Sequence, residues 1–236
     1  MSFLPGLESF ATCNDLGLDD LSRHFSRAAF FDIETDGLGK DANVTMIACL
    51  LDGRLELFIR GENLDAFLAR VESADLLVSF NGATFDEPKL LDHFRIPKFP
   101  CPHLDLRKIC KAHGITGGLK QIEKQIGLHR PADIVFMTGE DADWMWRAWE
   151  KDRDIVLWKK LLRYCAADVI ALQHLSAHLL GQSLPENPWS LLDGIGADID
   201  PARVEPVTAA AIAASDDPAY DRLRAHHRKR RSQMDI

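Results

Sequence analysis

The stretch Arg27-Ala-Ala-Phe-Phe-Asp-Ile-Glu-Thr-Asp-Gly37 is an apolar run with acids at two alternating positions, and it ends at a turn-forming Asp-Gly pair. It predicts a buried β-strand. Because strand side chains alternate between two faces, Asp32 and Glu34 are expected on one face, with Phe31 and Ile33 on the other. Carboxylates this close repel each other unless a cation lies between them, and hard divalent cations prefer carboxylate oxygens. The pair therefore predicts a cation site, whereas the alternative, an exposed polar strand edge, is disfavoured by the apolar neighbours.

A second apolar run, residues 76–80, ends at the turn-forming pair Asn81-Gly82, and a helix is predicted to begin near Phe85. Asp86 would then lie in the first turn of this helix. The helix dipole favours an acid there, so N-terminal capping alone explains Asp86 as well as a cation site does.

A further acid belongs to a long predicted helix, residues 154–180, in which apolar residues recur at helical spacing. Tyr164 and Asp168 are i and i+4 neighbours, so both lie on one face of this helix. A phenol hydroxyl and a carboxylate can thus reach one site. Such a pair is common on helices, and it gains weight only beside the other acids.

Three motifs therefore follow one another along the chain: Asp32-x-Glu34, Asn81-x-x-x-Phe85-Asp86 and Tyr164-x-x-x-Asp168. In this order they resemble the motifs of the DEDD exonucleases of the ribonuclease H-like superfamily, over residues 27 to 180. The tyrosine four positions before the last acid is similar to the tyrosine subgroup (DEDDy). The details are most similar to the predicted exonucleases of the YprB type, which are related to the proofreading domains of family B DNA polymerases.

The resemblance implies an α/β fold of the ribonuclease H-like type, with a mixed sheet flanked by helices. The residue pattern agrees, because strand-like and helical runs alternate along the chain. Runs at residues 30–34, 44–51 and 54–59 predict three antiparallel strands, and Asp52-Gly53 predicts a hairpin turn between the last two. Parallel strands are expected after them.

The predicted ribonuclease H-like exonuclease domain spans residues 27–184. Residues 1–26 are expected to form an N-terminal extension. Residues 185–236 are rich in Pro, Ala and Asp and then become basic, so this tail is expected to be largely disordered.

The resemblance also implies the activity, a metal-dependent 3′-5′ exonuclease that acts on single-stranded ends of DNA or RNA. Phosphodiester hydrolysis needs an activated water, neutralised phosphate charge and a stabilised leaving alkoxide, which two cations about 4 Å apart can supply. Tyr164 is expected to orient the water, since a phenol with a pKa of about 10 is a poor base near neutral pH. The ions are expected to be Mg²⁺ or Mn²⁺ and not Zn²⁺, which prefers Cys and His. The expected ligands are Asp32, Glu34, Asp86 and Asp168.

Three residues are expected to contact the nucleic acid. Phe85 can stack on the terminal base, and Asn81 can either contact the terminal nucleotide or simply form the turn. Lys120 follows a predicted helix start whose backbone amides can approach a phosphate, although a solvated helix face explains it equally well. Of the basic residues near the predicted site, only Lys120 is expected to hold the substrate, and a solvated helix face is the usual explanation for each of them. They are Lys89, Arg107, Lys108, Lys111, Lys120, Lys124 and Arg130.

The formal net charge of −8 disfavours a strong nonspecific grip on duplex nucleic acid. Five cysteines without Cys-x-x-Cys spacing favour a reducing compartment, so the expected location is the cytoplasm, and no segment predicts a membrane span. Two alternatives stay open on the same fold. One is a structure-selective endonuclease, and the other is a noncatalytic nucleic-acid-binding module. Pathway, protein partners and oligomeric state are left undecided by the sequence.

Overall fold

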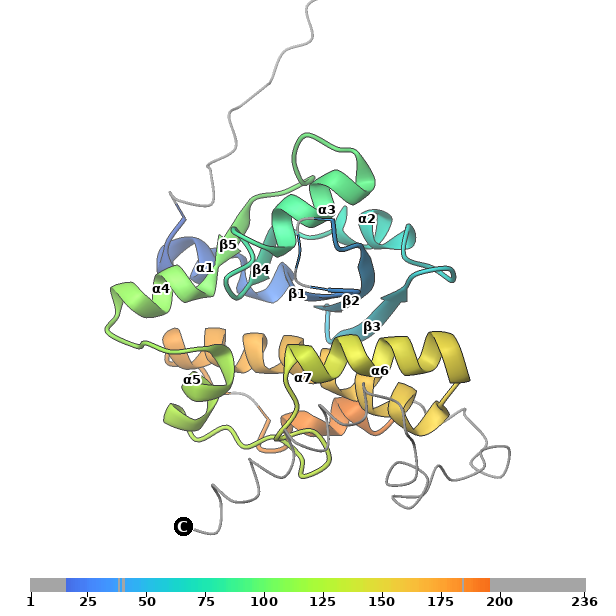
Figure 1. The fold of residues 1–236 in the computed structure, drawn as a ribbon. Coiled ribbons are helices and arrows are strands. Elements are labelled where there is room, and N and C mark those ends of the chain that lie inside the picture. Colours follow the sequence, from blue (N-terminus) through green and yellow to red (C-terminus); the bar gives the residue numbers. More distant parts are fainter. Residues whose placement is uncertain (1–15, 38, 40, 184, 196–236) are drawn as a thin grey trace, which may run out of the picture.

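The structure, a computed structural model, describes residues 16–37, 39, 41–183 and 185–195 (Figure 1). Residues 1–15 of the expected N-terminal extension and the basic part of the expected tail lie outside the described residues.

The centre of the molecule is a mixed five-stranded sheet with strand order β3-β2-β1-β4-β5. The first three strands are antiparallel, and β4 and β5 run parallel to β1, which confirms the expected α/β sheet. The strands are β1 (Ala28–Thr35), β2 (Val44–Leu51), β3 (Arg54–Ile59), β4 (Leu76–Ser79) and β5 (His103–Asp105).

The hairpin between β2 and β3 turns at Asp52 and Gly53, whose φ angles are 55° and 70°. Two consecutive positive φ values are typical of the tight turn that an Asp-Gly pair favours. In this hairpin Ala48 of β2 lies opposite Leu57 of β3, and on its other side Ala48 pairs with Asp32 of β1. The predicted turn is thus confirmed.

Helices cover both faces of the sheet, with α2 and α3 on one side and α6 and α7 on the other (Figure 1). The α-helices are α1 (Leu18–His24), α2 (Ala66–Val71), α3 (Asp86–Phe94), α4 (Leu106–Ala112), α5 (Leu119–Gln125), α6 (Gly139–Asp152) and α7 (Ile155–Leu179). Two 3₁₀ helices are η1 (Phe25–Arg27) and η2 (Pro188–Leu192). Among the residues that the structure describes, no helix combines the length and apolarity needed to cross a bilayer.

Each face of the sheet has its own apolar core. Phe30 of β1 packs in the core on the side of α6 and α7, whereas Phe31 and Ile33 pack in the core with α2 and α3. Because β1 alternates, Asp32 and Glu34 face the α7 side. The predicted separation of acids from apolar residues on this strand is confirmed, and it directs both carboxylates toward the longest helix.

Helix α7 is the main helical support of the sheet. It begins after Asp154, whose side chain accepts hydrogen bonds from the backbone N–H groups of Val156 and Leu157 at 3.0 and 3.1 Å. Such capping satisfies donors that have no partner inside the helix. Trp158 is buried on this helix and stacks on Trp149 of α6 with ring centroids 4.8 Å apart.

The packed elements extend past both expected domain limits. Leu21 of α1 is fully buried in the core on the α7 side, although it lies within the expected extension. Residues 185–195, expected in the disordered tail, include η2, and its Leu192 is fully buried in the same core. Both short segments therefore contribute an apolar side chain to the core that contains α7.

Candidate metal and nucleic-acid site

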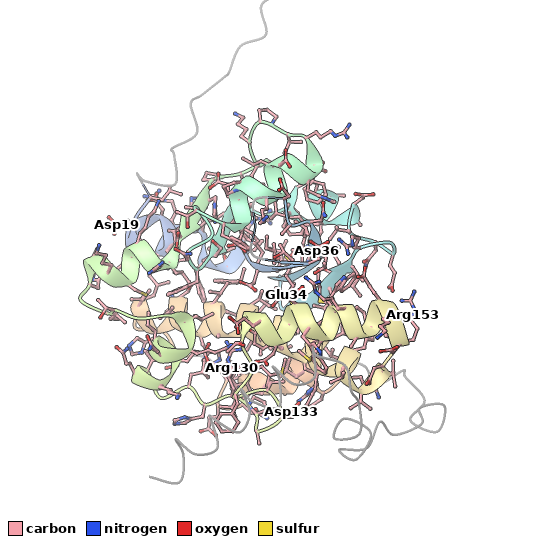
Figure 2. All side chains as sticks on the ribbon, viewed as in Figure 1. Asp19, Glu34, Asp36, Arg130, Asp133 and Arg153 are labelled. Carbon is pink, nitrogen blue, oxygen red and sulfur yellow. The ribbon has the colours of Figure 1, made fainter. Side chains whose placement is uncertain are left out.

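Side chains from β1, α5 and α7 meet at one cavity of about 360 Å³. Most of the residues proposed from the sequence line it: Asp32, Glu34, Phe85, Lys120, Tyr164 and Asp168. Figure 2 shows Glu34 between the sheet and the layer of α6 and α7. Residues more than 130 positions apart in the chain are thus brought to one place, at the end of β1.

The two acids of β1 are half-buried and electrostatically crowded. Removal from water raises the pKa of Asp32 well above its ordinary value, and the charges of Asp168 and Asp86 raise it further. The pKa of Glu34 is raised for the same reasons, by burial first and then by Asp168. Charges that repel each other in this way are those that a bound cation stabilises.

Asp86 is not among the residues that line this cavity, but it follows Phe85, which does line it. Asp86 is the first residue of α3 and is 5% exposed. Burial raises the pKa of its carboxyl to about 7, although hydrogen bonds from its own backbone and from that of Ile33 oppose the rise. The helix-terminal position predicted from the sequence is confirmed. The same carboxylate also raises the pKa values of the acids on β1, so Asp86 combines a first-turn position in α3 with a charge that acts on the site.

The turn before α3 passes close to Asp86. A Cβ atom on Gly82 would lie 2.9 Å from Asp86 Oδ2 and 2.8 Å from Ser79 Cβ. Only glycine leaves room for this approach. The Asn81-Gly82 pair therefore does more than end a strand, because it lets the chain bring Asp86 to the end of β1.

Tyr164 is buried and is held by Lys120. The ammonium of Lys120 donates to the Tyr164 hydroxyl oxygen at 2.9 Å and to the carbonyl oxygen of Met137. Burial raises the pKa of Tyr164 well above 10, and the charges of Asp168 and Glu34 add to this effect. The phenol therefore keeps its proton, and with Lys120 donating to its oxygen, its hydrogen is left to point at another acceptor.

Lys120 is not on a solvated helix face. It is half-buried, lines the cavity, and burial lowers the pKa of its ammonium. Its nitrogen lies 4.3 Å from the centre of the Tyr164 ring, within the range of a cation–π contact.

Asn81 has a different environment from the other proposed residues. Its backbone N–H donates to Asp105 Oδ1 at 2.7 Å, and its side-chain oxygen accepts from Arg107 Nη1 at 2.6 Å. Asp105 also accepts from the N–H groups of Ala83 and Arg107, so it caps the N-terminus of α4 and also holds the turn. Asn81 is not among the residues that line the cavity.

Arg130 and Glu123 complete the site, and the sequence does not single them out. Arg130 was expected to be a solvated basic residue, but its side chain is only 2% exposed and forms an ion pair with Asp168. Its Nε donates to Glu123 Oε2 at 2.7 Å. Helix α5 ends at Gln125, before Arg130, so no continuous helical period links Glu123 to Arg130. Only their common contact with α7 reveals them.

The donor set fits hard divalent cations. Asp32, Glu34 and Asp168 line the cavity, and octahedral oxygen sites suit Mg²⁺ and Mn²⁺. The charge of Asp86 acts on Asp32 from beside them. Cys165 also approaches, since its Sγ and one oxygen each of Asp32 and Glu34 lie within 4.8 Å of one another. This thiol is fully buried on α7, and burial raises its pKa well above the ordinary value, so it offers a protonated sulfur. The oxygen donors therefore determine which ions suit the cavity.

Comparison with known proteins agrees with this architecture. A family model described as RNase_H superfamily (RNase_H_2) matches residues 29–180. The family B DNA polymerase from the hyperthermophilic archaeon Pyrobaculum calidifontis has a similar structure, with a TM-score of 0.51 and 20% sequence identity. That similarity covers 65% of this chain and 24% of the polymerase chain, so it concerns the fold of a part of that protein. No curated protein sequence matches the chain.

Proposed function

Because the chain belongs to the ribonuclease H superfamily, we propose that it is a metal-dependent exonuclease that removes nucleotides from 3′ ends of single-stranded nucleic acid. The observation that carries this proposal is that carboxylates of β1 and α7 line one cavity beside a buried tyrosine, with the charge of Asp86 of α3 acting on Asp32. The polarity and the preference for ends are supported by the resemblance of the three motifs to tyrosine-type DEDD exonucleases.

Asp32, Glu34, Asp86 and Asp168 would hold two divalent cations, Mg²⁺ or Mn²⁺. Such a cation pair supplies a hydroxide near neutral pH and neutralises charge on the phosphate and on the leaving oxygen. The raised pKa values of Asp32, Glu34 and Asp86 support this assignment, because without cations the acids oppose one another's ionisation.

Tyr164 would orient the attacking water through its hydroxyl hydrogen. Its raised pKa makes it a poor base, and the hydrogen bond from Lys120 fixes the position of its oxygen. Lys120 would place positive charge beside the scissile phosphate, where a partly buried ammonium interacts more strongly than in water. Tyr164 would therefore orient the water and Lys120 would neutralise phosphate charge, and neither would have to transfer a proton.

Phe85 would stack on the terminal base at the cavity wall. Asn81, which lies outside the cavity lining next to Arg107, would contact the strand where it leaves the cavity. The proposed location is the cytoplasm, since Cys49, Cys101, Cys110 and Cys165 are all unpaired thiols within the described residues.

The deciding experiment is hydrolysis of end-labelled single-stranded DNA and RNA with Mg²⁺, Mn²⁺ or a chelator. Wild-type protein should act only with a metal, and Asp32→Ala and Asp168→Ala should lower the rate by at least about 10³-fold, as loss of a group essential to the chemistry does. Asp19→Ala, on the exposed surface of α1, is the matched control and should be fully active. Equal rates for all four proteins would refute the mechanism.

The two alternatives are separated by substrate shape and by binding. An exonuclease should release mononucleotides from linear strands and leave circular single strands intact. Circles cut as rapidly as linear strands would establish the structure-selective endonuclease instead. A noncatalytic binding module would bind labelled strands with no hydrolysis under any metal condition.

A further inference from the structure

A buried chain of charges runs from α5 to the proposed cation site. Arg130 contacts Glu123 through Nε and Nη2, and the same Nη2 donates to Asp168 Oδ1. The side chains of Glu123 and Arg130 are 3% and 2% exposed. Figure 2 shows Arg130 on the segment that follows α5, beneath α7. Arg130 therefore forms one ion pair with Asp168, a proposed metal ligand, and another with Glu123.

A contribution to folding stability does not explain why Glu123, Arg130 and Asp168 form buried ion pairs. Desolvating charged groups offsets most of what their attraction gains, so a buried ion pair is weak evidence for a stabilising role. Arg130 Nη1 is buried without a hydrogen-bond partner among the described residues, which is a further cost. Burial also raises the pKa of Glu123. The fold therefore buries the charges of Arg130 and Glu123 at a cost, at the position where Arg130 contacts Asp168 Oδ1.

We propose that Arg130, anchored by Glu123, is a positioning residue for the cation site. The guanidinium binds Glu123 through Nε and Nη2, and Nη2 also donates to Oδ1 of Asp168, whose side chain lines the cavity. The oxygen of Asp168 that Arg130 does not bind would then be the one available to a cation. This inference rests on the proposed function, because it concerns the same four carboxylates. Groups that hold a metal ligand in place commonly change metal affinity by about 10- to 100-fold when they are replaced.

The test has to separate geometry from charge. Removing the guanidinium would also remove a positive charge that repels cations, and the two effects have opposite signs. Arg130→Lys keeps the charge but loses the planar fork that reaches both acids. Glu123→Gln keeps the size of the anchor but frees Arg130 from its counter-charge, so Arg130 competes more strongly for Asp168. Both variants should therefore weaken cation binding.

The readout is Mn²⁺ affinity without substrate, measured by electron paramagnetic resonance, together with circular dichroism and urea denaturation. Arg130→Lys and Glu123→Gln should be folded and bind Mn²⁺ about 10- to 100-fold more weakly than wild type. Arg163→Lys is the matched control. It carries the same substitution on α7, but Arg163 pairs with Asp133 away from the cavity, so its affinity should equal that of wild type.

Folded variants whose Mn²⁺ affinity stays within about twofold of wild type would overturn this inference and leave the proposed function intact. A wild-type protein that binds no Mn²⁺ and hydrolyses nothing would overturn the proposed function itself. If neither variant folds, the Arg130 Nε–H resonance of the wild type decides. It should stay protected from solvent exchange and shift when Mg²⁺ binds, and an unshifted resonance would overturn the positioning role.

Discussion

Replacing Asp86 by Asn should stabilise the metal-free protein at alkaline pH. The pKa of Asp86 is about 7 in the folded protein, because burial disfavours its charge, and about 3.9 in an unfolded chain. A group whose pKa is raised by folding favours the folded state below the unfolded pKa, and this contribution is lost as pH rises toward the folded pKa. Asn is uncharged at every pH and can still accept the hydrogen bond from the Ile33 backbone.

The size of the effect follows from the pKa difference. One pKa unit corresponds to about 1.4 kcal/mol, so ionising Asp86 costs the metal-free fold up to about 4 kcal/mol at pH 8. Most of this loss develops between about pH 4 and pH 7. Conversely, a cation present at about 100 times its Kd should stabilise the wild type by about 2.7 kcal/mol, and the Asn variant by much less.

The assay is urea denaturation at about pH 5 and pH 8, with chelator or with Mg²⁺. Asp92→Asn is the matched control, because it lies exposed on the same helix and should change stability by less than about 0.5 kcal/mol. The free energy of unfolding of Asp86→Asn should exceed that of wild type only without metal, and the difference should be larger at pH 8 than at pH 5. An Asn variant that is less stable than wild type at pH 8 in chelator would refute the reasoning about charge burial.

Gly82→Ala should distort the turn before α3, since the new Cβ would clash with Ser79 and would lie 2.9 Å from Asp86 Oδ2. We expect about 1–3 kcal/mol lower stability and, because Asp86 would shift, at least a tenfold loss of nuclease activity. Unchanged activity would contradict this reading of the turn. Tyr164→Phe should fold normally but lower kcat by about 10- to 100-fold with little change in KM, as expected for a group that orients the water. If Tyr164→Phe instead raised KM and left kcat unchanged, the tyrosine would act in substrate binding. Trp158→Ala, a buried core position, should lower unfolding free energy by about 3–5 kcal/mol while the remaining folded protein keeps its Mn²⁺ affinity.

Much of the fold was predictable because its signals are local. Alternation in β1, the Asp52-Gly53 hairpin and the apolar spacing of α7 each depend on neighbouring residues. The packing of η2 was not predicted, because a short segment such as Pro188–Leu192 carries no periodic signal and is ordered by tertiary contacts, the burial of Leu192 and a hydrogen bond from Arg163 to its carbonyl oxygen.

The stretch that begins at Arg27 by itself determined that two acids leave a buried strand on one face, since a strand's alternation is a property of the backbone. The spacing of Tyr164 and Asp168 likewise follows from the pitch of a helix. Only the tertiary structure decided that Lys120 holds the tyrosine, that Arg130 and Glu123 hold Asp168, and that Asn81 stays outside the cavity. These contacts join residues 38 and 44 positions apart, for which the chain has no period, and they form only when α5 and α7 pack together.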